Sequence, residues 1–470
     1  MYSRSLQLSS STYFVFLAAV FALYWSASRF RTLTLAVVLF ANYFFYAKWD
    51  LFYLALIPAV SSCDYIFGLG LQYSQGRVVR RILVAASILM NVGLLATIKY
   101  VPFFLQNWSA ISGRPAPEWH WVLPVSLSFY VFQALTYTID LYRRDSKGTR
   151  SYLAHLAAVS FFPTTLAGPI TRVSSLIDQF EKPKKLDPAD GGRALFLIGM
   201  GLMKKLLIAD FLGANLVNRV FDTPTLYSGA ETLVAVYAYT LQIYYDFSGY
   251  TDIAIGSALL LGIRLPVNFN RPYAAENVAD FWRRWHITLS NWLRDYLYFS
   301  LPGKRSKAMV YVNLILTMVI GGLWHGAAWT FVIWGALHGV GLAVVRGWQT
   351  YRKGAPKAAG VWRYVNIFAT FHFVVFAWIF FRAPDVATAW EVLGRIGSLS
   401  VSAANLSGSF ALILAIGILA HYVPKKWYEL SLGFFVRAPF YAQAAALALL
   451  VVGLQYVAQT GATPFIYNKF

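Results

Sequence analysis

Long apolar stretches recur along almost the whole chain and leave few choices of fold. Most are close to the ~20 residues that a helix needs to cross the hydrocarbon core of a bilayer. They occupy residues 12–27, 33–47, 51–71, 82–105, 119–141, 193–212, 230–247, 309–323, 327–346, 364–382, 409–423 and 438–458. Such continuous apolar runs do not fit the alternating strands of a membrane barrel, so the spans must be helices. The sequence therefore predicts an all-α, polytopic membrane protein with about 11–12 crossings.

Composition and charge exclude two other classes of protein. Of the 470 residues, 58% are hydrophobic and only 13% are charged, which leaves too little polar surface for a soluble globule of this size. The net charge of +20 is also found in nucleic-acid-binding proteins, but here the basic residues lie in short loops between apolar runs. We therefore expect contact with membrane lipids and no nucleic-acid partner. The single cysteine, Cys63, can form neither an intrachain disulfide nor a metal site.

The basic clusters set the orientation in the membrane. They fall in alternate loops, at Arg29/Arg31, Arg77/Arg80/Arg81, Arg143/Arg144/Lys147/Arg150, Lys182/Lys184/Lys185, Lys304/Arg305/Lys307, Arg346/Arg352/Lys353/Lys357 and Lys425/Lys426. The positive-inside rule makes that side cytoplasmic and leaves the N-terminus outside. Residues 12–27 resemble the core of a signal peptide, but Arg4 is a weak positive flank and Arg29 suits a retained span. No linker or internal repeat is evident, so we expect a single domain over residues 1–470.

Two stretches interrupt the regular pattern of spans. Residues 152–172 lie between two cytoplasmic basic clusters and contain Pro163, Gly168 and Pro169. Residues 246–264 also return to the cytoplasmic side, and their apolar run is interrupted by Asp246, Ser248, Gly249 and Asp252. Broken backbone at membrane depth is tolerated only where it is buried in protein or lines a water-filled cavity. We therefore expect both stretches to be re-entrant segments beside an internal chamber.

An amphipathic pattern covers residues 281–296. At helical spacing, one face would carry Trp282, Trp285, His286, Leu289, Trp292, Leu293 and Tyr296, and the other Arg283, Arg284, Thr288, Asn291, Arg294 and Asp295. This predicts a helix lying along the cytoplasmic interface, and a plain surface anchor would explain most of it. The anchor does not explain His286, because an imidazole on the apolar face needs a polar partner inside the protein.

A second histidine, His325, lies between two long apolar runs in Gly321-Gly322-Leu323-Trp324-His325-Gly326. An ionisable side chain at membrane depth is costly, so such a residue is by default a functional-site hypothesis. The alternative is a neutral core imidazole with both nitrogens hydrogen-bonded. The glycines remove side-chain bulk around the ring, which permits close approach of a substrate or of another backbone segment.

Several ordered motifs resemble those of a known family. They are Trp282-Arg283-Arg284-Trp285-His286, Leu293-Arg294-Asp295-Tyr296-Leu297-Tyr298 and Gly322-Leu323-Trp324-His325-Gly326, with Ser128-Phe129-Tyr130, Phe161-Phe162-Pro163, Ala167-Gly168-Pro169, Ile243-Tyr244-Tyr245-Asp246-Phe247-Ser248-Gly249-Tyr250, Phe269-Asn270, Pro272-Tyr273 and Pro464-Phe465-Ile466-Tyr467. The chain thus resembles the membrane-bound O-acyltransferase (MBOAT) family and its bacterial alginate O-acetyltransferase-like branch. The resemblance implies a ring of helices around a thinned centre, where a cytoplasmic acyl donor meets an acceptor hydroxyl from outside. It also implies that His325 is catalytic, that His286 is needed for activity, and that the protein lies in the bacterial inner membrane.

The chemistry of acyl transfer agrees with two histidines. Transfer from a thioester to an alcohol needs a base for the hydroxyl proton and donors for a tetrahedral oxyanion, and the pKa of histidine suits the first task. We assign His325 as general base and His286 to positioning or polarising the thioester carbonyl. A covalent acyl-enzyme intermediate would use the same residues and stays open. No metal and no permanently bound cofactor are expected.

Acetyl-coenzyme A is the expected donor, because its phosphates would be attracted to Arg283, Arg284, Arg294, Lys304 and Arg305. For any one of these residues, positive-inside topology with anionic-lipid contact is an equal explanation. An acyl carrier protein is the alternative donor, as in relatives that transfer D-alanine to teichoic acid. The candidate substrate-binding residues are Asp246, Ser248, Tyr250, Asn270, Trp324 and His338. For Asp246, the cap of a re-entrant helix is the favoured alternative.

Three classes of function fit these features. The first is an O-acetyltransferase that decorates an exported polysaccharide, such as an alginate-like polymer, cellulose or another glycan, with periplasmic transferase proteins as expected partners. The second is a transporter of acyl groups or polysaccharide, since transporters also build substrate sites from broken membrane helices. The third is a scaffold without chemistry of its own. The motifs favour the first.

Overall fold

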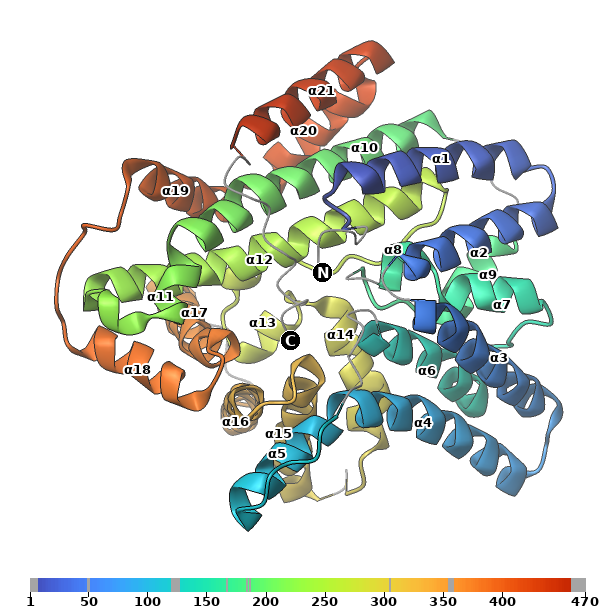
Figure 1. Cartoon of the computed structure of the whole chain (residues 1–470), viewed down its shortest axis with the longest axis horizontal. Coiled ribbons are helices and arrows are strands. Elements are labelled where there is room, and N and C mark those ends of the chain that lie inside the picture. Colours follow the sequence, from blue (N-terminus) through green and yellow to red (C-terminus); the bar gives the residue numbers. More distant parts are fainter. Residues whose placement is uncertain are drawn as a thin grey trace. The chain divides into compact units, whose positions relative to one another are not determined.

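The computed structural model describes residues 7–48, 51–119, 127–165, 168–182, 185, 187–303, 306–353 and 359–457. All regular structure within these residues is helical and none is strand, as the sequence predicts (Figure 1). The chain divides into two compact units. Unit 1 comprises Met1–Ile198 with Thr251–Pro266, and unit 2 comprises Gly199–Tyr250 with Val267–Phe470. The expectation of a single domain stays a prediction.

Unit 1 is built from helices that begin at recognisable caps. It contains α1 (Ser11–Ala27), α2 (Arg31–Ala47), α3 (Leu51–Tyr73), α4 (Arg77–Lys99), α5 (Val101–Ser112), α6 (Leu127–Arg143), α7 (Tyr152–Val159), α8 (Phe162–Thr165), α9 (Val173–Phe180) and most of α10 (Pro188–Leu202). The hydroxyls of Ser10 and Ser151 accept backbone N–H groups in the first turns of α1 and α7. Helices α3, α4 and α6 pack against one another, and this packing positions the loops that follow α3 and α6.

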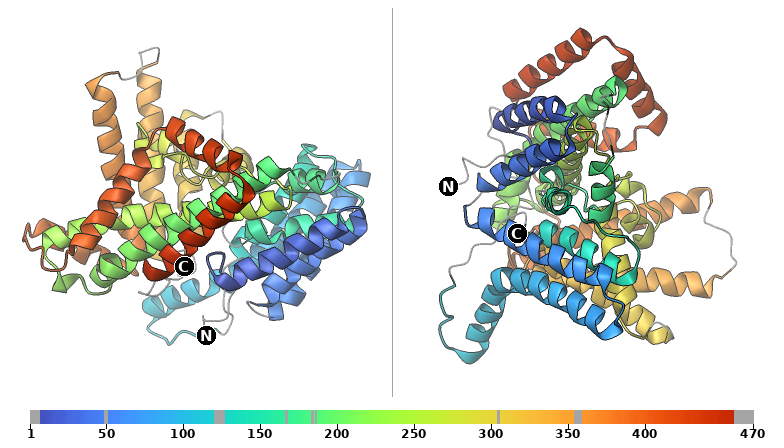
Figure 2. Two further views of the ribbon diagram at one scale, coloured as in Figure 1. Left: turned by 90° about the horizontal axis from the view of Figure 1, so that it is seen from above. Right: turned by 90° about the vertical axis from the view of Figure 1, so that its right-hand side faces the viewer.

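Unit 2 carries the longer helices of the chain. It contains η2 (Met203–Asp210), η3 (Gly213–Val217), α11 (Asn218–Asp222), η4 (Pro224–Leu226), most of α12 (Gly229–Leu260), η5 (Pro272–Ala274), α13 (Val278–Trp282), α14 (Ile287–Trp292), η6 (Leu293–Leu297), η7 (Tyr298–Ser300), α15 (Lys307–His325), α16 (Trp329–Tyr351), α17 (Val361–Arg382), α18 (Val386–Gly397), α19 (Gly408–Tyr422), α20 (Lys425–Arg437) and α21 (Phe440–Val457). Helix α16 packs against both α15 and α17 (Figure 2).

Long apolar helices make this a polytopic membrane protein. Among the described residues, five helices are long and apolar enough to cross a bilayer, namely Leu54–Tyr73 of α3, α4, α15, α16 and α17. Helices α19 and α20 meet at 94° and would count as a sixth span if taken together. Shorter apolar helices are α1, α2 and Phe440–Leu454 of α21. Length and composition therefore support fewer crossings than the 11–12 expected, and the expected ring of helices stays a prediction.

The predicted interruption at residues 246–252 is wrong. Helix α12 runs unbroken from Gly229 to Leu260, so Asp246 lies in mid-helix and cannot be the N-cap that its position suggested. Asp246 is accommodated within the helix because its carboxylate pairs with Lys205 beside it. Gly249 also permits close packing, since a β-carbon there would lie 2.7 Å from the carbonyl oxygen of Gly201. The chain turns only afterwards, at Gly262, where φ is +69°.

The backbone is broken in the other interrupted stretch, residues 152–172. Helix α7 ends at Val159 and the four-residue α8 begins at Phe162. A side chain at Gly168 would collide with the backbone of Pro163, so the chain after α8 folds back closely on that helix. The re-entrant path of the stretch through a membrane stays a prediction.

Candidate active site

The close approach of two helices fixes the position of His325. Helix α15 ends at His325, and α16 begins at Trp329 after a turn in which Gly326 is extended. A side chain at Gly322 would meet the carbonyl oxygen of Phe331, and one at Gly326 would meet the Phe331 ring. The glycines beside the histidine therefore permit the approach of another part of the protein, one of the two uses that the sequence left open.

Aromatic rings surround the His325 side chain, which is only 4% exposed. The imidazole centroid lies 4.9 Å from Trp324, 5.2 Å from Trp334 and 5.1 Å from Phe381, each in an edge-on arrangement. The immediate surroundings of the imidazole are therefore largely apolar. A neutral imidazole is the form that a general base requires.

His286 occupies a break in the helical segment where the sequence predicted one continuous helix. Its backbone is left-handed, with φ of +42°, between α13 and α14. The prediction of a single amphipathic helix over residues 281–296 is therefore wrong. The predicted apolar face is confirmed, because all seven of its residues are buried. The predicted polar face is confirmed only in part: Arg283, Asn291 and Arg294 are exposed, but Thr288 is buried.

The partner of His286 is Asn268, which the sequence analysis missed. The Asn268 Oδ1 atom accepts the Thr288 backbone N–H at 3.2 Å and the Thr288 hydroxyl at 2.9 Å, so it is an acceptor. At 3.1 Å from that oxygen, the Nδ1 atom of His286 is therefore the N–H donor. Burial lowers the pKa of His286 to about 3, so the ring is neutral and its Nε2 carries a lone pair. This tautomer favours a positioning role over polarisation of a carbonyl.

Two indole rings connect three histidines. The Trp324 ring lies 6.3 Å from His286 and 4.9 Å from His325, and the Trp334 ring lies 5.2 Å from His325 and 4.9 Å from His338. We call these three histidines, with the two tryptophans, the histidine–tryptophan cluster. The structure thus brings together four residues that the sequence singled out: His286, Trp324, His325 and His338.

His338 has the opposite tautomer from His286. Its Nδ1 atom accepts the indole N–H of Trp282 at 3.2 Å, so its Nε2 atom carries the proton in the neutral ring. The residue is fully buried, and this Nε2–H has no hydrogen-bond partner among the residues that the structure describes. The cluster therefore contains a neutral lone pair on His286 and a neutral N–H donor on His338.

Asp246 belongs to a separate ionic group in the same unit. Its carboxylate lies 2.5 Å from the ammonium of Lys205, which is also 2.7 Å from Asp210 and 5.5 Å from the centre of the Tyr250 ring. These four residues, which we call the lysine cluster, are at most 6% exposed. Ser248 is buried on α12 as well. The sequence analysis missed Lys205 and Asp210, although ionisable residues inside the apolar run 193–212 were a usable signal.

The other candidate residues lie at the surface or outside the described residues. Asn270 has an exposed side chain, and only its backbone N–H is bound, to the carbonyl of Arg284. Arg283 and Arg284 both pair with Asp280, and Arg294 pairs with Asp295. Lys304 and Arg305 fall outside the described residues. Every candidate that the structure does describe belongs to unit 2.

Comparison with known proteins agrees with this arrangement. The profile of the membrane-bound O-acyltransferase family matches residues 83–383, a range that includes His286, His325 and His338. The chain belongs to the membrane-bound O-acyltransferase family. It is therefore an O-acyltransferase, and the buried histidines lie within the part that defines the family.

The names of three relatives each combine an acyl group with a polymer. The chain is 40% identical to the probable alginate O-acetylase AlgI of Azotobacter vinelandii over 87% of this chain and 82% of that protein. It is 37% identical to the peptidoglycan O-acetyltransferase of Helicobacter pylori over 78% and 74% of the two chains. It is 31% identical to the teichoic acid D-alanyltransferase of Bacillus subtilis over 60% and 75%. Within this membrane-bound O-acyltransferase family, the relatives thus differ in acyl group and in acceptor.

Proposed function

We propose that this protein transfers an acetyl group from cytoplasmic acetyl-coenzyme A to hydroxyls of an exported polysaccharide, in the bacterial inner membrane. The observation that carries the proposal is that His286 and His325 flank one indole ring, Trp324, inside a single compact unit. Two independent sequence motifs meet there. Kinship with alginate and peptidoglycan O-acetylating proteins supports acetyl as the group and a glycan as the acceptor.

In the proposed reaction, His325 removes the proton from the acceptor hydroxyl as its oxygen attacks the thioester carbonyl. The carbon–sulfur bond of the tetrahedral intermediate then breaks, and the released coenzyme A thiolate takes up a proton. The lone pair on His286 Nε2 can accept a hydrogen bond from a second hydroxyl of the same sugar, which would orient the attacking hydroxyl towards the thioester. The Nε2–H of His338 is a hydrogen-bond donor of the kind that would stabilise the tetrahedral oxyanion.

The proposal requires that both substrates reach a ring that is 4% exposed. Access from opposite sides of the membrane is therefore part of the hypothesis. Modification of His325 by diethyl pyrocarbonate, followed by mass spectrometry, would test it: acetyl-coenzyme A should protect the residue. Failure of the reagent to modify His325 in folded protein, with and without the donor, would contradict an accessible catalytic histidine.

The decisive experiment compares donor use with polymer modification. Purified protein in detergent should release free coenzyme A from acetyl-coenzyme A when a glycan acceptor is supplied, and His325→Ala should abolish that release. A host that carries His325→Ala should export polysaccharide without acetyl esters. Vesicle uptake without any thioester cleavage would instead indicate a transporter, and loss of polymer esters without any coenzyme A release would indicate a scaffold for periplasmic transferase partners.

A carrier-protein donor is the second candidate, because the teichoic acid D-alanyltransferase of Bacillus subtilis is also a relative. Replacing acetyl-coenzyme A with an acylated carrier protein in the same assay distinguishes the two candidate donors. Faster acyl transfer from the carrier than from acetyl-coenzyme A would favour the second candidate.

A further inference from the structure

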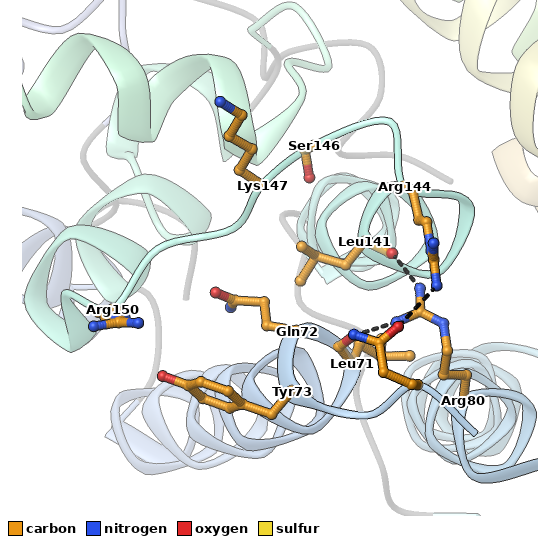
Figure 3. Close-up of a pocket in the computed structure, with 10 residues that line it drawn as sticks. Leu71, Gln72, Tyr73, Arg80, Leu141, Arg144, Ser146, Lys147 and Arg150 are labelled. Carbon is orange, nitrogen blue, oxygen red and sulfur yellow. Dashed lines mark hydrogen bonds between the residues drawn. The ribbon is translucent and has the colours of Figure 1, made fainter. Parts of the chain in front are cut away.

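Unit 1 contains a polar cavity that the proposed acyl transfer does not use. Its volume is about 350 Å³, and it opens between the turn after α3 and the loop after α6. Figure 3 shows Gln72 and Tyr73 on one side and Ser146 and Lys147 on the other. Arg80 and Arg144 lie at one end and Arg150 at the opposite end (Figure 3). We call this the basic pocket.

The charge of the basic pocket is one-sided. Its described lining includes four cationic residues, Arg80, Arg144, Lys147 and Arg150, and no carboxylate. Within the described residues, the Lys147 and Arg150 side chains have no ion-pair partner, and both residues are exposed. Like charges held together without counter-charge repel one another, so an anion in the pocket would be stabilised by them.

Arg80 has a different role from the other three cations. It is 7% exposed, and its guanidinium donates to the carbonyl oxygens of Leu71 and Ser74 after α3 and of Leu141 and Tyr142 at the end of α6. A cation at two helix C-termini satisfies carbonyls that have no partner within the helix. Arg80 therefore holds the two walls of the pocket together and is not a suitable residue to mutate in a binding test.

Two uncharged donors point to a ligand as well. The Gln72 Nε2 and Ser146 Oγ atoms are buried in the pocket lining, and neither has a hydrogen-bond partner among the described residues. Burial of a polar group without a partner costs stability. An oxyanion between them would accept hydrogen bonds from both, in addition to the charges of Lys147 and Arg150. Cations beside neutral donors form the set that a phosphate requires.

The position of the pocket indicates where the phosphate comes from. It lies where candidate span Leu54–Tyr73 ends and candidate span α4 begins. Tyr73, at that end, is 63% exposed, as is typical of an aromatic residue at the membrane–water boundary. The start of α4 and the loop after α6 carry basic clusters that the positive-inside rule assigns to the cytoplasmic side, where anionic headgroups concentrate.

We propose that the basic pocket binds a phosphate-bearing ligand, and that its source is the headgroup of an anionic phospholipid of the cytoplasmic leaflet. Lys147 and Arg150 contribute charge, and Gln72 and Ser146 donate hydrogen bonds to the phosphate oxygens. All residues of the pocket belong to unit 1, whereas the histidine–tryptophan cluster belongs to unit 2.

Native mass spectrometry of the full chain, released from detergent micelles that contain phosphatidylglycerol, tests this proposal. The double variant Lys147→Gln/Arg150→Gln should bind the lipid about tenfold more weakly, because it loses two charge-assisted contacts. The matched control is Arg77→Gln/Arg81→Gln, which removes the same charge from exposed residues of α4 that do not line the pocket. The control should change affinity by about twofold or less. Equal weakening in both variants would overturn the pocket, because it would mean that charge acts without a site.

A second arm distinguishes the source of the phosphate. If inorganic phosphate at millimolar concentration displaces the lipid from the native protein, a phosphate-binding site stands and the ligand's acyl chains add little. If only the lipid binds, the headgroup in its membrane is the ligand. Gln72→Met and Ser146→Ala keep the charge and remove one donor each, so each should weaken binding about threefold while thermal unfolding is unchanged. Unaltered affinity in both of these variants and in the charge variant would refute the proposal.

Discussion

The histidine–tryptophan cluster and the lysine cluster are both buried in unit 2, but they satisfy their polar groups in different ways. Lys205 lies between two carboxylates, so opposite charges offset the cost of removing each other from water. His325 and His338 are instead packed against aromatic rings, and the Nε2–H of His338 has no partner among the described residues. A buried N–H donor such as that of His338 adds little to folding.

The contrast teaches which of two equally buried polar groups to consider functional. A self-compensated ionic group can be retained because it stabilises a fold. A buried imidazole N–H such as that of His338, which has no partner among the described residues, needs another reason, and chemistry on a bound substrate is one. This argument predicts that mutations in the histidine–tryptophan cluster act mainly on activity. Mutations in the lysine cluster should act mainly on stability.

The largest effect is expected at His325. We expect His325→Gln to lower kcat for acetyl transfer by about 10²- to 10⁴-fold, the usual contribution of a general base. The free energy of unfolding in detergent should change much less than kcat, because glutamine keeps a polar side chain of similar length at this position. Steady-state coenzyme A release and thermal unfolding on the same preparation would measure both.

His372 provides the matched control for that experiment. Its Nε2 atom accepts the Tyr237 hydroxyl at 2.9 Å, and its Nδ1 atom lies 2.9 Å from the Phe368 carbonyl oxygen, so both nitrogens have partners. His372→Gln should lower the unfolding temperature and leave kcat almost unchanged. The comparison would fail if His325→Gln lowered the unfolding temperature as much as His372→Gln does and also retained as much activity as His372→Gln.

The second largest effect is expected at Lys205, and on stability. Lys205→Met removes the cation between Asp210 and Asp246 and leaves two buried carboxylates without a counter-charge. Loss of one partner of a buried ion pair costs about 3–5 kcal/mol. The unfolding temperature of purified protein would measure the loss.

A compensating variant keeps the prediction about Lys205 falsifiable. Lys205→Met combined with Asp210→Asn and Asp246→Asn removes all three charges and should recover most of the stability. Recovery of stability without recovery of activity would give the lysine cluster a role beyond stability, in line with the substrate-binding role that the sequence suggested for Asp246. In that case, the division between a structural and a chemical cluster would fail.

The sequence predicted the class of fold and singled out three histidines that the structure brings together, but it did not predict how the polar residues are accommodated. Hydrophobic run length was enough for an all-α membrane protein, since only helices satisfy the backbone within lipid. The prediction from local sequence was wrong for helix α12. Asp246 and Gly249 would disrupt a buried helix only if the carboxylate had no counter-charge and the space beside the glycine stayed empty. Here Lys205 pairs with the carboxylate and the backbone near Gly201 fills the space beside the glycine, and neither contact is visible in local sequence.

The limit of local sequence also explains why Asn270, and not Asn268, was the candidate. Phe269-Asn270 belongs to a recognisable motif, so Asn270 was the candidate and Asn268 was overlooked. The side chain that reaches His286 is selected by the backbone around residues 268–288, where the left-handed conformation of His286 aligns its ring with Asn268. Periodicity over residues 281–296 identified the buried face, but it could not reveal the break that creates this contact.

That pair of residues gives a third, smaller prediction. Asn268→Ala removes the acceptor that fixes the Nδ1–H tautomer of His286, so kcat should fall by about 10- to 100-fold through misplacement of the ring. Asn268→Asp retains an acceptor oxygen and should recover part of the loss. Asn270→Ala is the control, because that side chain is exposed, and it should have almost wild-type activity. Equal losses at both asparagines would remove the case for a positioned His286.

The smallest effect is expected at the arginines beside the cluster. Arg283 and Arg284 share the carboxylate of Asp280, with side chains 66% and 28% exposed, so much of their charge is already neutralised or screened. Arg283→Gln should therefore raise the KM for acetyl-coenzyme A by only about two- to fivefold, with kcat unchanged. The increase in KM should become smaller as the salt concentration rises, because salt screens the attraction between the arginine and the phosphates.

Arg352→Gln is the control. It removes one exposed charge from another basic loop and should leave KM unaltered. A salt-independent loss of kcat at Arg283 would instead mean that this arginine acts on the reacting groups, and the boundary drawn around the histidine–tryptophan cluster would have to include it.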